Sequence, residues 1–417
     1  MPAALPSLPH ATVDWGIVAI FAIVYLGMFL GGLPKLKLDR SGVALLGAIA
    51  VIGSGALDTE QAARAVDLPT ILLLFSFMVV SAQMRLGGFY TAVTRQVAAL
   101  QLSRNGLLGA LLAVAAALSA VFSNDIVCLA MTPVVARICL QRGFAPLPFL
   151  VGLACAANIG SAATLIGNPQ NMLIGSLMQL SFADYARTAL PPVVISLVVL
   201  WFWLVWVQRS ASVLPTASGT NSEDDPPFDA WQTVKGLSIA GALLVIFLFT
   251  SWPREVAALV AAGLLLLSRR FHSSHVMGFI DWELLVLFIG LFVVNHAFET
   301  TGLATQAVAW LAAQGVHLAE SGPLFAAGLI LSNFVSNVPA VMLLIPHLDT
   351  HEAGTALALV STFAGNLLLV GSIANLIVVD LARRSGIEID WRGHARIGIP
   401  ITLATTAIVW IWLRWMA

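Results

Sequence analysis

The sequence predicts an all-α, polytopic membrane protein made of two related halves with opposite topology. Three observations lead to this: a scarcity of charge, an uneven distribution of the basic residues, and an internal repeat. Of 417 residues, 59% are hydrophobic and 10% are charged, whereas a typical soluble domain has about 25% charged residues. With a net charge of -1 there is no basic surface for nucleic acid. These numbers exclude a soluble enzyme, a nucleic-acid-binding protein and a disordered chain.

The apolar segments account for roughly ten membrane crossings, since a crossing needs about 20 apolar residues. Apolar runs lie at 13–31, 41–57, 68–84, 146–180, 188–208, 231–250, 255–268, 282–298, 354–382 and 396–415. Two further apolar stretches, 105–140 and 321–347, are interrupted by Ser123-Asn124-Asp125 and by Ser336-Asn337-Val338-Pro339. Because each part of these stretches is only about 12–18 residues long, we expect re-entrant hairpins there.

The basic residues predict the orientation of the chain in the bilayer. With the N-terminus outside, sixteen of the twenty Lys and Arg residues fall on the cytoplasmic side, and Arg64, Arg187, Arg254 and Arg414 fall outside. Such a bias follows the positive-inside rule, so both termini are expected to be non-cytoplasmic. The count is the same for a re-entrant hairpin and for a complete two-pass hairpin, so it supports orientation and not re-entrance.

The two halves of the chain match each other at an offset of about 214 residues. At this offset Asp67 matches Asp281, Gly88 matches Gly302, and, at 213, Ser123-Asn124 matches Ser336-Asn337. After a slip of ten residues, Gly167 matches Gly371 and Asn171 matches Asn375. Each half has five crossings, an odd number, so the second half enters the membrane from the opposite face. Inverted repeats of this kind are typical of secondary transporters. We expect the repeats at 1–209 and 231–417, joined by a cytoplasmic linker at 210–230.

Polar residues gather at four places that correspond in pairs: the two hairpin tips and the breaks in two interrupted helices. Polar groups within a membrane are costly and therefore suggest function. The candidate residues for binding substrate and ion are Ser123, Asn124, Asp125, Asn158, Thr164, Gly167, Asn168, Asn171, Ser336, Asn337, Asn366, Gly371, Ser372 and Asn375. Asn168 and Pro169 predict a half-helix that starts near 168 and runs through Ile174. Its N-terminus, and a matching one capped by Ser372, could hold an anion without any Lys or Arg.

Other roles for these residues stay open. Asn, Ser and Gly in membrane helices often serve helix packing, but their repeated placement favours binding. Asp125 is the only carboxylate at a predicted tip and could bind a cation, carry a proton or cap a helix. We favour a coupling role. If Na⁺ is the coupling ion, we expect it at Asn124, Asp125 and Asn337, and H⁺ is the other candidate; no resident metal and no cofactor are expected.

The same motifs resemble the ion transporter superfamily over essentially the whole chain. Phe122-Ser123-Asn124-Asp125 through Met131-Thr132-Pro133 and Ser336-Asn337-Val338-Pro339-Ala340 are similar to the hairpins of arsenite permeases. Ala157-Asn158-Ile159-Gly160 through Asn171 and Gly365-Asn366 through Asn375 are similar to the interrupted helices of citrate transporters and divalent-anion:sodium symporters. The tips depart from the SN-Thr pattern of dicarboxylate carriers at Asp125 and Val338, and this argues against a fixed dicarboxylate specificity.

The resemblance implies an elevator mechanism. Residues of about 105–180 and 321–385 would form a moving transport domain, and the remainder a scaffold that forms a homodimer. We therefore expect a transporter of the prokaryotic-type inner membrane that carries a small oxyanion or carboxylate by secondary active symport with Na⁺ or H⁺. An arsenite or antimonite efflux permease, or a Na⁺/H⁺ antiporter, is the alternative within the superfamily. An enzyme is not expected, because neither GxSxG nor HExxH occurs, and two related gates fit alternating access better than a channel.

Overall fold

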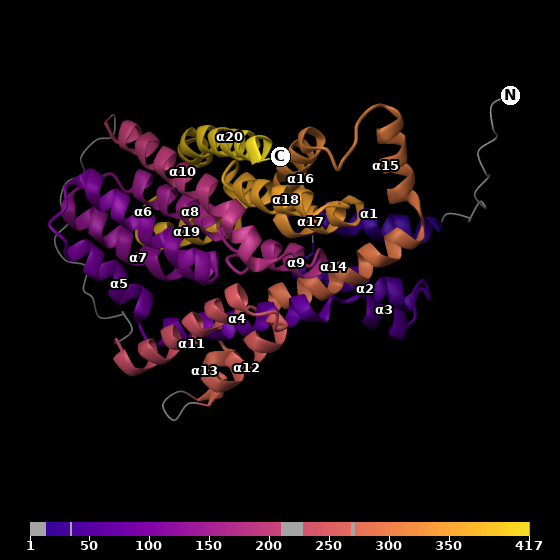
Figure 1. Ribbon diagram of the computed structural model, residues 1–417, viewed down its shortest axis with the longest axis horizontal. Helices are drawn as coiled ribbons and strands as arrows, with labels where there is room; N and C mark the ends of the chain where they lie inside the picture. Colours follow the sequence, from indigo (N-terminus) through magenta and orange to yellow (C-terminus); the bar gives the residue numbers. More distant parts are fainter. Residues whose placement is uncertain (1–13, 34–35, 210–227, 268–271, 417) are drawn as a thin grey trace. The chain divides into compact units, whose positions relative to one another are not determined.

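The computed structural model describes residues 14–33, 36–209, 228–267 and 272–416, and all regular structure within these ranges is helical. Contacts divide the chain into two compact units. Unit 1 comprises Met1–Asp67 and Glu283–His317, and unit 2 comprises Leu68–Trp282 and Leu318–Ala417. Each unit takes segments from both halves of the sequence, which Figure 1 colours from indigo to yellow along the chain. The predicted linker, 210–230, lies almost entirely outside the described residues.

Unit 1 contains α1 (Trp15–Leu30), α2 (Arg40–Gly53), α3 (Thr59–Ala65), nearly all of α14 (Trp282–Thr300) and α15 (Leu303–Ala313). The side chain of Asp39 accepts a hydrogen bond from the backbone N–H of Gly42 and so caps α2. The Tyr25 hydroxyl on α1 donates to Oδ1 of Asn295 on α14 at 2.8 Å. A Cβ atom at Gly290 would lie 2.7 Å from the backbone of Ala44, so this glycine permits close packing of α14 on α2.

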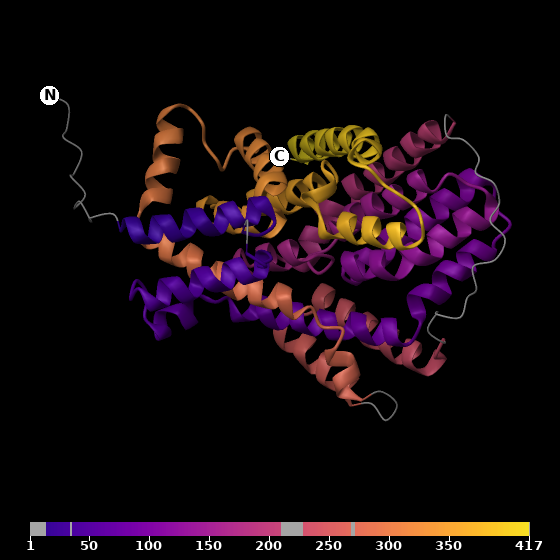
Figure 2. The ribbon, with the colours of Figure 1, turned by 180° about the vertical axis from the view of Figure 1, so that it is seen from behind.

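Unit 2 contains the other helices and all candidate site residues. From the first half it has α4 (Leu68–Leu86), α5 (Phe89–Ala99), α6 (Arg104–Val121), α7 (Asn124–Arg142), α8 (Pro146–Ser161), α9 (Pro169–Leu177) and α10 (Phe182–Gln208). From the second half it has α11 (Ala230–Phe249), α12 (Arg254–Leu266), α13 (Ser273–Met277), α16 (Ser321–Val335), α17 (Asn337–Leu344), α18 (His351–Ala364), α19 (Ile373–Arg384) and α20 (Trp391–Met416). Helices α6, α7 and α8 lie side by side (Figure 1), and α4 packs with α11 and α12 (Figure 2).

The helices agree with a multi-pass membrane protein. By length and apolar composition, seven of those described can cross a bilayer: α4, α6, α7, α10, α11, α14 and α20. The predicted crossings at 41–57 and 255–268 are present as α2 and α12, but these helices have only 14 and 13 residues. At 1.5 Å per residue they extend about 20 Å, less than the hydrocarbon thickness of about 30 Å. The apolar runs continue past the points where the helices end, so run length overestimated helix length.

Both predicted hairpin tips lie at breaks between helices. Phe122 and Ser123 separate α6 from α7, and Ser336 separates α16 from α17. In the first pair α6 has 18 residues, within the predicted 12–18, and α7 has 19, one more than predicted. Helices of this length fall within the range of full crossings, so their length does not support re-entrance. The second pair is shorter, with 15 residues in α16 and 8 in α17, and a 3-10 turn at Ile345–His347 follows.

The helices of the second half occur in the same order as the corresponding helices of the first half. Helices α4 and α14 both have 19 residues and start 214 residues apart, and so do the 11-residue helices α5 and α15. The matched pair Gly88 and Gly302 precede α5 and α15 with φ of 67° and 70°. These left-handed values favour glycine, which explains why this residue recurs at both positions.

Candidate functional site

A network of buried amide and hydroxyl side chains lies where two interrupted helices and the first hairpin tip meet. Asn158 on α8 is its centre and is only 2% exposed. Its Oδ1 accepts from Nδ2 of Asn124 at 3.0 Å and from Oγ of Ser372 at 3.1 Å. Its Nδ2 donates to Oδ1 of Asn366 at 2.9 Å and to Oδ1 of Asn375 at 3.4 Å. One side chain of the first half thus binds the tip of its own half and the break of the other half.

Thr362 on α18 makes the corresponding contacts in the opposite direction. Its Oγ1 donates to Oδ1 of Asn171 at 3.2 Å and accepts from Asn168 and Gln170 at 3.3 and 3.2 Å. Thr362 lies 204 residues after Asn158, the same offset that relates Asn171 to Asn375. We call Asn124, Asn158, Asn168, Gln170, Asn171, Thr362, Asn366, Ser372 and Asn375 the amide cluster.

The half-helices on either side of the cluster start as predicted. Oδ1 of Asn168 accepts from the backbone N–H of Asn171 and caps α9, with Pro169 at the first helical position. Oγ of Ser372 accepts from the N–H of Ala374 and caps α19. Because the N-termini of both half-helices lie within the cluster, their partial positive charges are directed into an uncharged, buried environment.

The backbone at the first break is held by close contacts. The N–H of Asn124 donates to the carbonyl of Gly167 at 3.3 Å, which joins the hairpin tip to the break. A Cβ atom at Gly167 would lie 2.3 Å from the carbonyl oxygen of Ser161, so no larger residue fits there. Thr164 bridges the same region, because its hydroxyl donates to the carbonyl of Ala120 and its own carbonyl accepts from Nδ2 of Asn171.

The second hairpin tip lies beside the second break. A Cβ atom at Gly365 would meet Nδ2 of Asn337 at 3.2 Å, and one at Gly371 would meet Oδ1 of Asn333 at 2.8 Å. Among the described residues the buried Oδ1 atoms of Asn337 and Asn333 have no hydrogen-bond partner. Ser336 has φ 76° and ψ 161°, a region that is essentially restricted to glycine. The tip therefore carries backbone strain and unpaired carbonyl-type oxygens.

The two remaining candidates at the first tip are less buried than the cluster. Ser123 and Asp125 are half-buried, and Ser123 makes no side-chain capping bond to α7. The carboxylate of Asp125 forms no hydrogen bond or ion pair with the described residues, although the charge of Asp281 acts on it. The members of the amide cluster carry no formal charge, so Asp125 is the only ionisable group among the predicted site residues.

Several contributors were not among the predicted residues. Thr362 could have been found from the 204-residue offset to Asn158. Gln170 was part of the recognised motif but not named as a site residue. Tyr185 on α10 is buried, accepts from Nδ2 of Asn171 at 3.0 Å and donates to the carbonyl of Ala162 at 2.8 Å. Nothing in the local sequence around Tyr185 indicates this contact, because it depends on how α10 packs.

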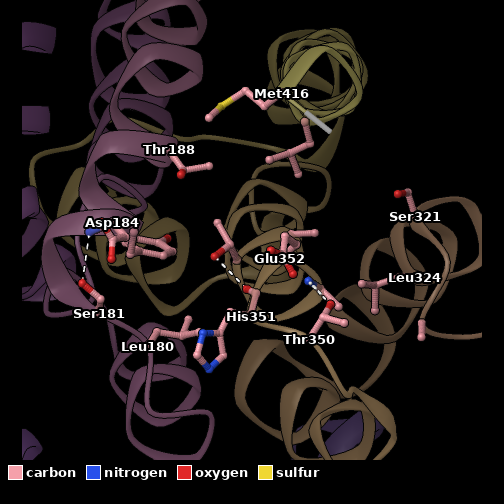
Figure 3. A pocket seen from close by; sticks show the side chains of 16 residues that line it. Leu180, Ser181, Asp184, Thr188, Ser321, Leu324, Thr350, His351, Glu352 and Met416 are labelled. Carbon is pink, nitrogen blue, oxygen red and sulfur yellow. Dashed lines mark hydrogen bonds between the residues drawn. The ribbon is translucent and has the colours of Figure 1, made fainter.

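A pocket of about 630 Å³ lies between the starts of α10, α16 and α18 and the end of α20 (Figure 3). Asp184, His351 and Glu352 are among its polar lining residues, and Leu180 and Leu324 are among its apolar ones. Tyr185 also lines it, and its hydroxyl bonds Asn171, so this side chain contacts both the pocket and the amide cluster. A second hollow of about 660 Å³ shares Leu180 and Ser181 with the first.

One basic residue contacts an end of the half-helix α9. The Nη2 atom of Arg254, the first residue of α12, donates to the carbonyl of Gly175 at 2.7 Å. Gly175 lies at the opposite end of α9 from the Asn168 cap. The half-buried guanidinium therefore complements the negative end of the α9 dipole.

Many apolar helices, two interrupted by polar breaks around a buried uncharged cluster, define a membrane transporter. The chain belongs to the citrate transporter family, whose model matches residues 17–359. It is 28% identical to the silicon efflux transporter LSI3 of Oryza sativa subsp. japonica, with 97% of each chain aligned. It is 29% identical to inner membrane protein YbiR of Escherichia coli strain K12, covering 84% of this chain and 88% of that one.

A solved structure shares the fold. The crystal structure of the YdaH transporter of Alcanivorax borkumensis superposes with a TM-score of 0.58 and covers 96% of this chain and 97% of that one, at 14% sequence identity. Together the comparisons show a multi-pass membrane transporter, not an enzyme, and bear out the family predicted from the motifs.

Proposed function

We propose that this protein is a secondary active transporter of a small oxyanion or carboxylate, coupled to Na⁺ or H⁺, in a prokaryotic-type inner membrane. The observation that carries the proposal is the amide cluster, in which two capped half-helix N-termini and side chains of both halves meet away from solvent. Helix N-termini bind anions through free N–H groups and the helix dipole. Interrupted helices that meet in this way are typical of substrate sites in transporters.

In this proposal the cluster binds the substrate and the hairpin tips bind the coupling ion. Carbonyl-type oxygens are the ligands that a small hard cation prefers. Within the described ranges, Asn337 and Asn124 each have a buried Oδ1 without a hydrogen-bond partner. Asp125 adds the negative charge that would attract Na⁺ or accept H⁺. A co-bound cation would in turn balance an anion in a site without Lys or Arg.

We further propose that the two halves are inverted repeats and that the protein works as an elevator in a homodimer. The matching lengths and order of the helices support the repeat. The pocket of Figure 3 borders the starts of α10 and α18, which the charge distribution assigns to the non-cytoplasmic side. It would serve as the approach to the cluster from that side, with Tyr185 in contact with both.

The experiment that tests the proposal is uptake into proteoliposomes. Citrate, succinate, sulfate and arsenate are offered singly, with an imposed Na⁺ gradient, an imposed pH gradient, or neither. We expect accumulation of at least one anion that depends on one gradient and is absent from empty liposomes. Failure of every anion under both gradients would contradict the proposal, and unitary currents in a planar bilayer would point to a channel.

A second candidate is efflux of a neutral metalloid hydroxide. Two observations favour it: the cluster consists of uncharged amides and hydroxyls, and a relative aligned along 97% of each chain is named a silicon efflux transporter. Arsenous and silicic acids are neutral at physiological pH and bind through hydroxyl groups. Transport of arsenite, antimonite or silicic acid in the same liposomes, without any anion uptake, would select this alternative, and Na⁺-dependent proton release would select an antiporter.

A further inference from the structure

Two polar rings hold the backbone at the two helix breaks in the same way. Tyr185 is the fourth residue of α10, and its hydroxyl donates to the carbonyl of Ala162, which directly follows α8. His394 is the fourth residue of α20, and its Nε2 lies 3.1 Å from the carbonyl oxygen of Asn366, shortly after α18. Both rings are only 2% exposed. In each half, a ring on the final helix thus contacts a backbone carbonyl at the break of the interrupted helix.

His394 lies next to the amide cluster, because it contacts the backbone carbonyl of Asn366, but its side chain bonds none of the side chains of the cluster. Asn366 joins the cluster through its side chain, whose Oδ1 accepts from Asn158, whereas His394 holds its backbone carbonyl. Gly398, one turn later on α20, allows this approach, because a Cβ atom there would lie 2.2 Å from the same carbonyl oxygen. His394 therefore acts on the site through Asn366 and is a positioning residue.

The two rings differ in whether they can take up a proton near neutral pH. A carbonyl oxygen only accepts, so Nε2 of His394 must carry the hydrogen, and Nδ1 is the atom that gains a proton when the ring ionises. Imidazole changes charge between about pH 5 and 8, a range in which tyrosine stays neutral. Since the amide cluster has no basic side chain, protonation of His394 would add the positive charge that an anion lacks there.

The charged groups of the neighbouring elements lie mainly at the other end of α20. Helix α10 carries Asp184 and Arg187 near its start, and α18 carries His351 and Glu352 at its start. Asp184, His351 and Glu352 line the pocket together with Leu413 and Met416, at the C-terminal end of α20.

Closer to the ring there are few charges, and all of them lie at the surface. Arg209 follows the end of α10, and α20 and the residue before it carry Asp390, Arg392 and Arg396, all of which are exposed. Helix α8 contains neither acidic nor basic residues. Among the described residues named here, His394 is therefore the buried group near the start of α20 that can take up a proton.

We propose that His394 is a proton-responsive positioning residue that strengthens anion binding as the pH falls, by holding the Asn366 carbonyl and by adding positive charge beside the second break. The inference rests on the anion substrate of the proposed function, since a neutral hydroxide would gain nothing from the charge. One linked proton changes the apparent affinity by up to about tenfold per pH unit. Replacing His394 by glutamine, an uncharged donor, should remove the pH dependence of anion affinity and keep the hydrogen bond to the Asn366 carbonyl.

The first test does not need transport. The ring nitrogens of ¹⁵N-histidine-labelled protein are followed by NMR from pH 8 to pH 5, and the His394 signals are those lost in His394→Gln. We expect a neutral ring with hydrogen on Nε2 at pH 8, proton uptake at Nδ1 within the range, and uptake at higher pH when sulfate or citrate is bound. If His394→Gln does not fold, a variant that keeps His394 and replaces the other seven histidines by Gln assigns the signals. A ring that keeps one charge state throughout, or carries hydrogen on Nδ1 at pH 8, overturns the proposal.

The second test compares pH profiles of uptake. Sulfate is the preferred probe, because its own charge is constant between pH 5.5 and 8, and citrate is the second. We expect the apparent affinity of wild type and Tyr185→Phe to rise on acidification, and that of His394→Gln to stay constant within about twofold. A wild-type profile in His394→Gln overturns the proposal. If no anion is taken up by wild type, the proposed function fails while the NMR result still decides the state of the ring.

Discussion

The hydroxyl of Thr362 donates to the amide oxygen of Asn171 across 191 residues of sequence. Asn158 makes the matching contact to Asn375 in the other direction. The two half-helices are thus each held by a side chain from the opposite half, and neither break can change shape without affecting the other. This reciprocity is what a single site shared by both halves requires.

Removing the Thr362 hydroxyl should weaken substrate binding. In Thr362→Val the shape is kept, but Asn168, Gln170 and Asn171 lose a buried partner, at a cost of about 1–3 kcal/mol. We expect at least a tenfold rise in KM for uptake. Thr362→Ser keeps the hydroxyl and should stay near wild type. Equal KM values for the Val and Ser variants would show that the hydroxyl is not used.

Asn158→Ala should impair both folding and transport. It removes the partner of Asn124, Asn366, Asn375 and Ser372 at once, and we expect a loss of stability of several kcal/mol and uptake reduced at least tenfold. Asn295→Ala is the matched control, because Asn295 is also buried and bonds Tyr25 within unit 1. The control should unfold at a lower temperature in detergent but keep the KM of wild type. A raised KM in Asn295→Ala would contradict a site confined to unit 2.

Much of this architecture could be predicted because local signals suffice for it. Asn168 followed by Pro169 determines a helix start whatever surrounds it, and the ten apolar runs all contain helices. The buried amides of the two breaks were found because polar residues are rare in a chain with 10% charge. Their placement at equivalent positions of two halves made convergence the simplest expectation.

The remainder depended on packing that spacing alone does not reveal. Tyr185 and His394 act through the way α10 and α20 lie against the breaks, and each looks like an ordinary residue in its own segment. The strained conformation of Ser336 has no signal, because its counterpart Ser123 in the same motif has φ -56°. Helix ends inside apolar runs, such as the end of α2 just before Ser54, cannot be read from hydropathy either.

Ser336→Gly should not destabilise the protein, in contrast to Ser123→Gly. The backbone of Ser336 occupies a region that costs about 1–3 kcal/mol for a residue other than glycine. Relief of that strain should outweigh the entropy that glycine adds to the unfolded chain, which is about 0.5–1 kcal/mol. At Ser123 only the entropic loss applies. Thermal unfolding in one detergent checks both, and an equal decrease in both variants would argue against strain at the second tip.

Asp125→Asn should uncouple transport from the ion gradient. The variant keeps the size of the side chain but loses the charge that would attract Na⁺ or take up H⁺. We expect accumulation against the substrate gradient to be lost, while exchange of labelled for unlabelled substrate persists. Glu60→Gln, in the exposed Glu60–Arg64 ion pair of α3, is the control and should accumulate substrate normally. Unchanged gradient-driven uptake by Asp125→Asn would assign coupling to another group.

The bond from Arg254 to Gly175 has a consequence for the direction of the transport cycle. A hydrogen bond to a charged group contributes about 1.5–3 kcal/mol, and this one joins α12, in the proposed scaffold, to α9, in the proposed moving part. In an elevator it must be broken whenever α9 departs and is remade whenever α9 returns. In the proposed elevator, leaving the conformation described here costs this bond, so that proposal expects the protein without substrate to favour this conformation.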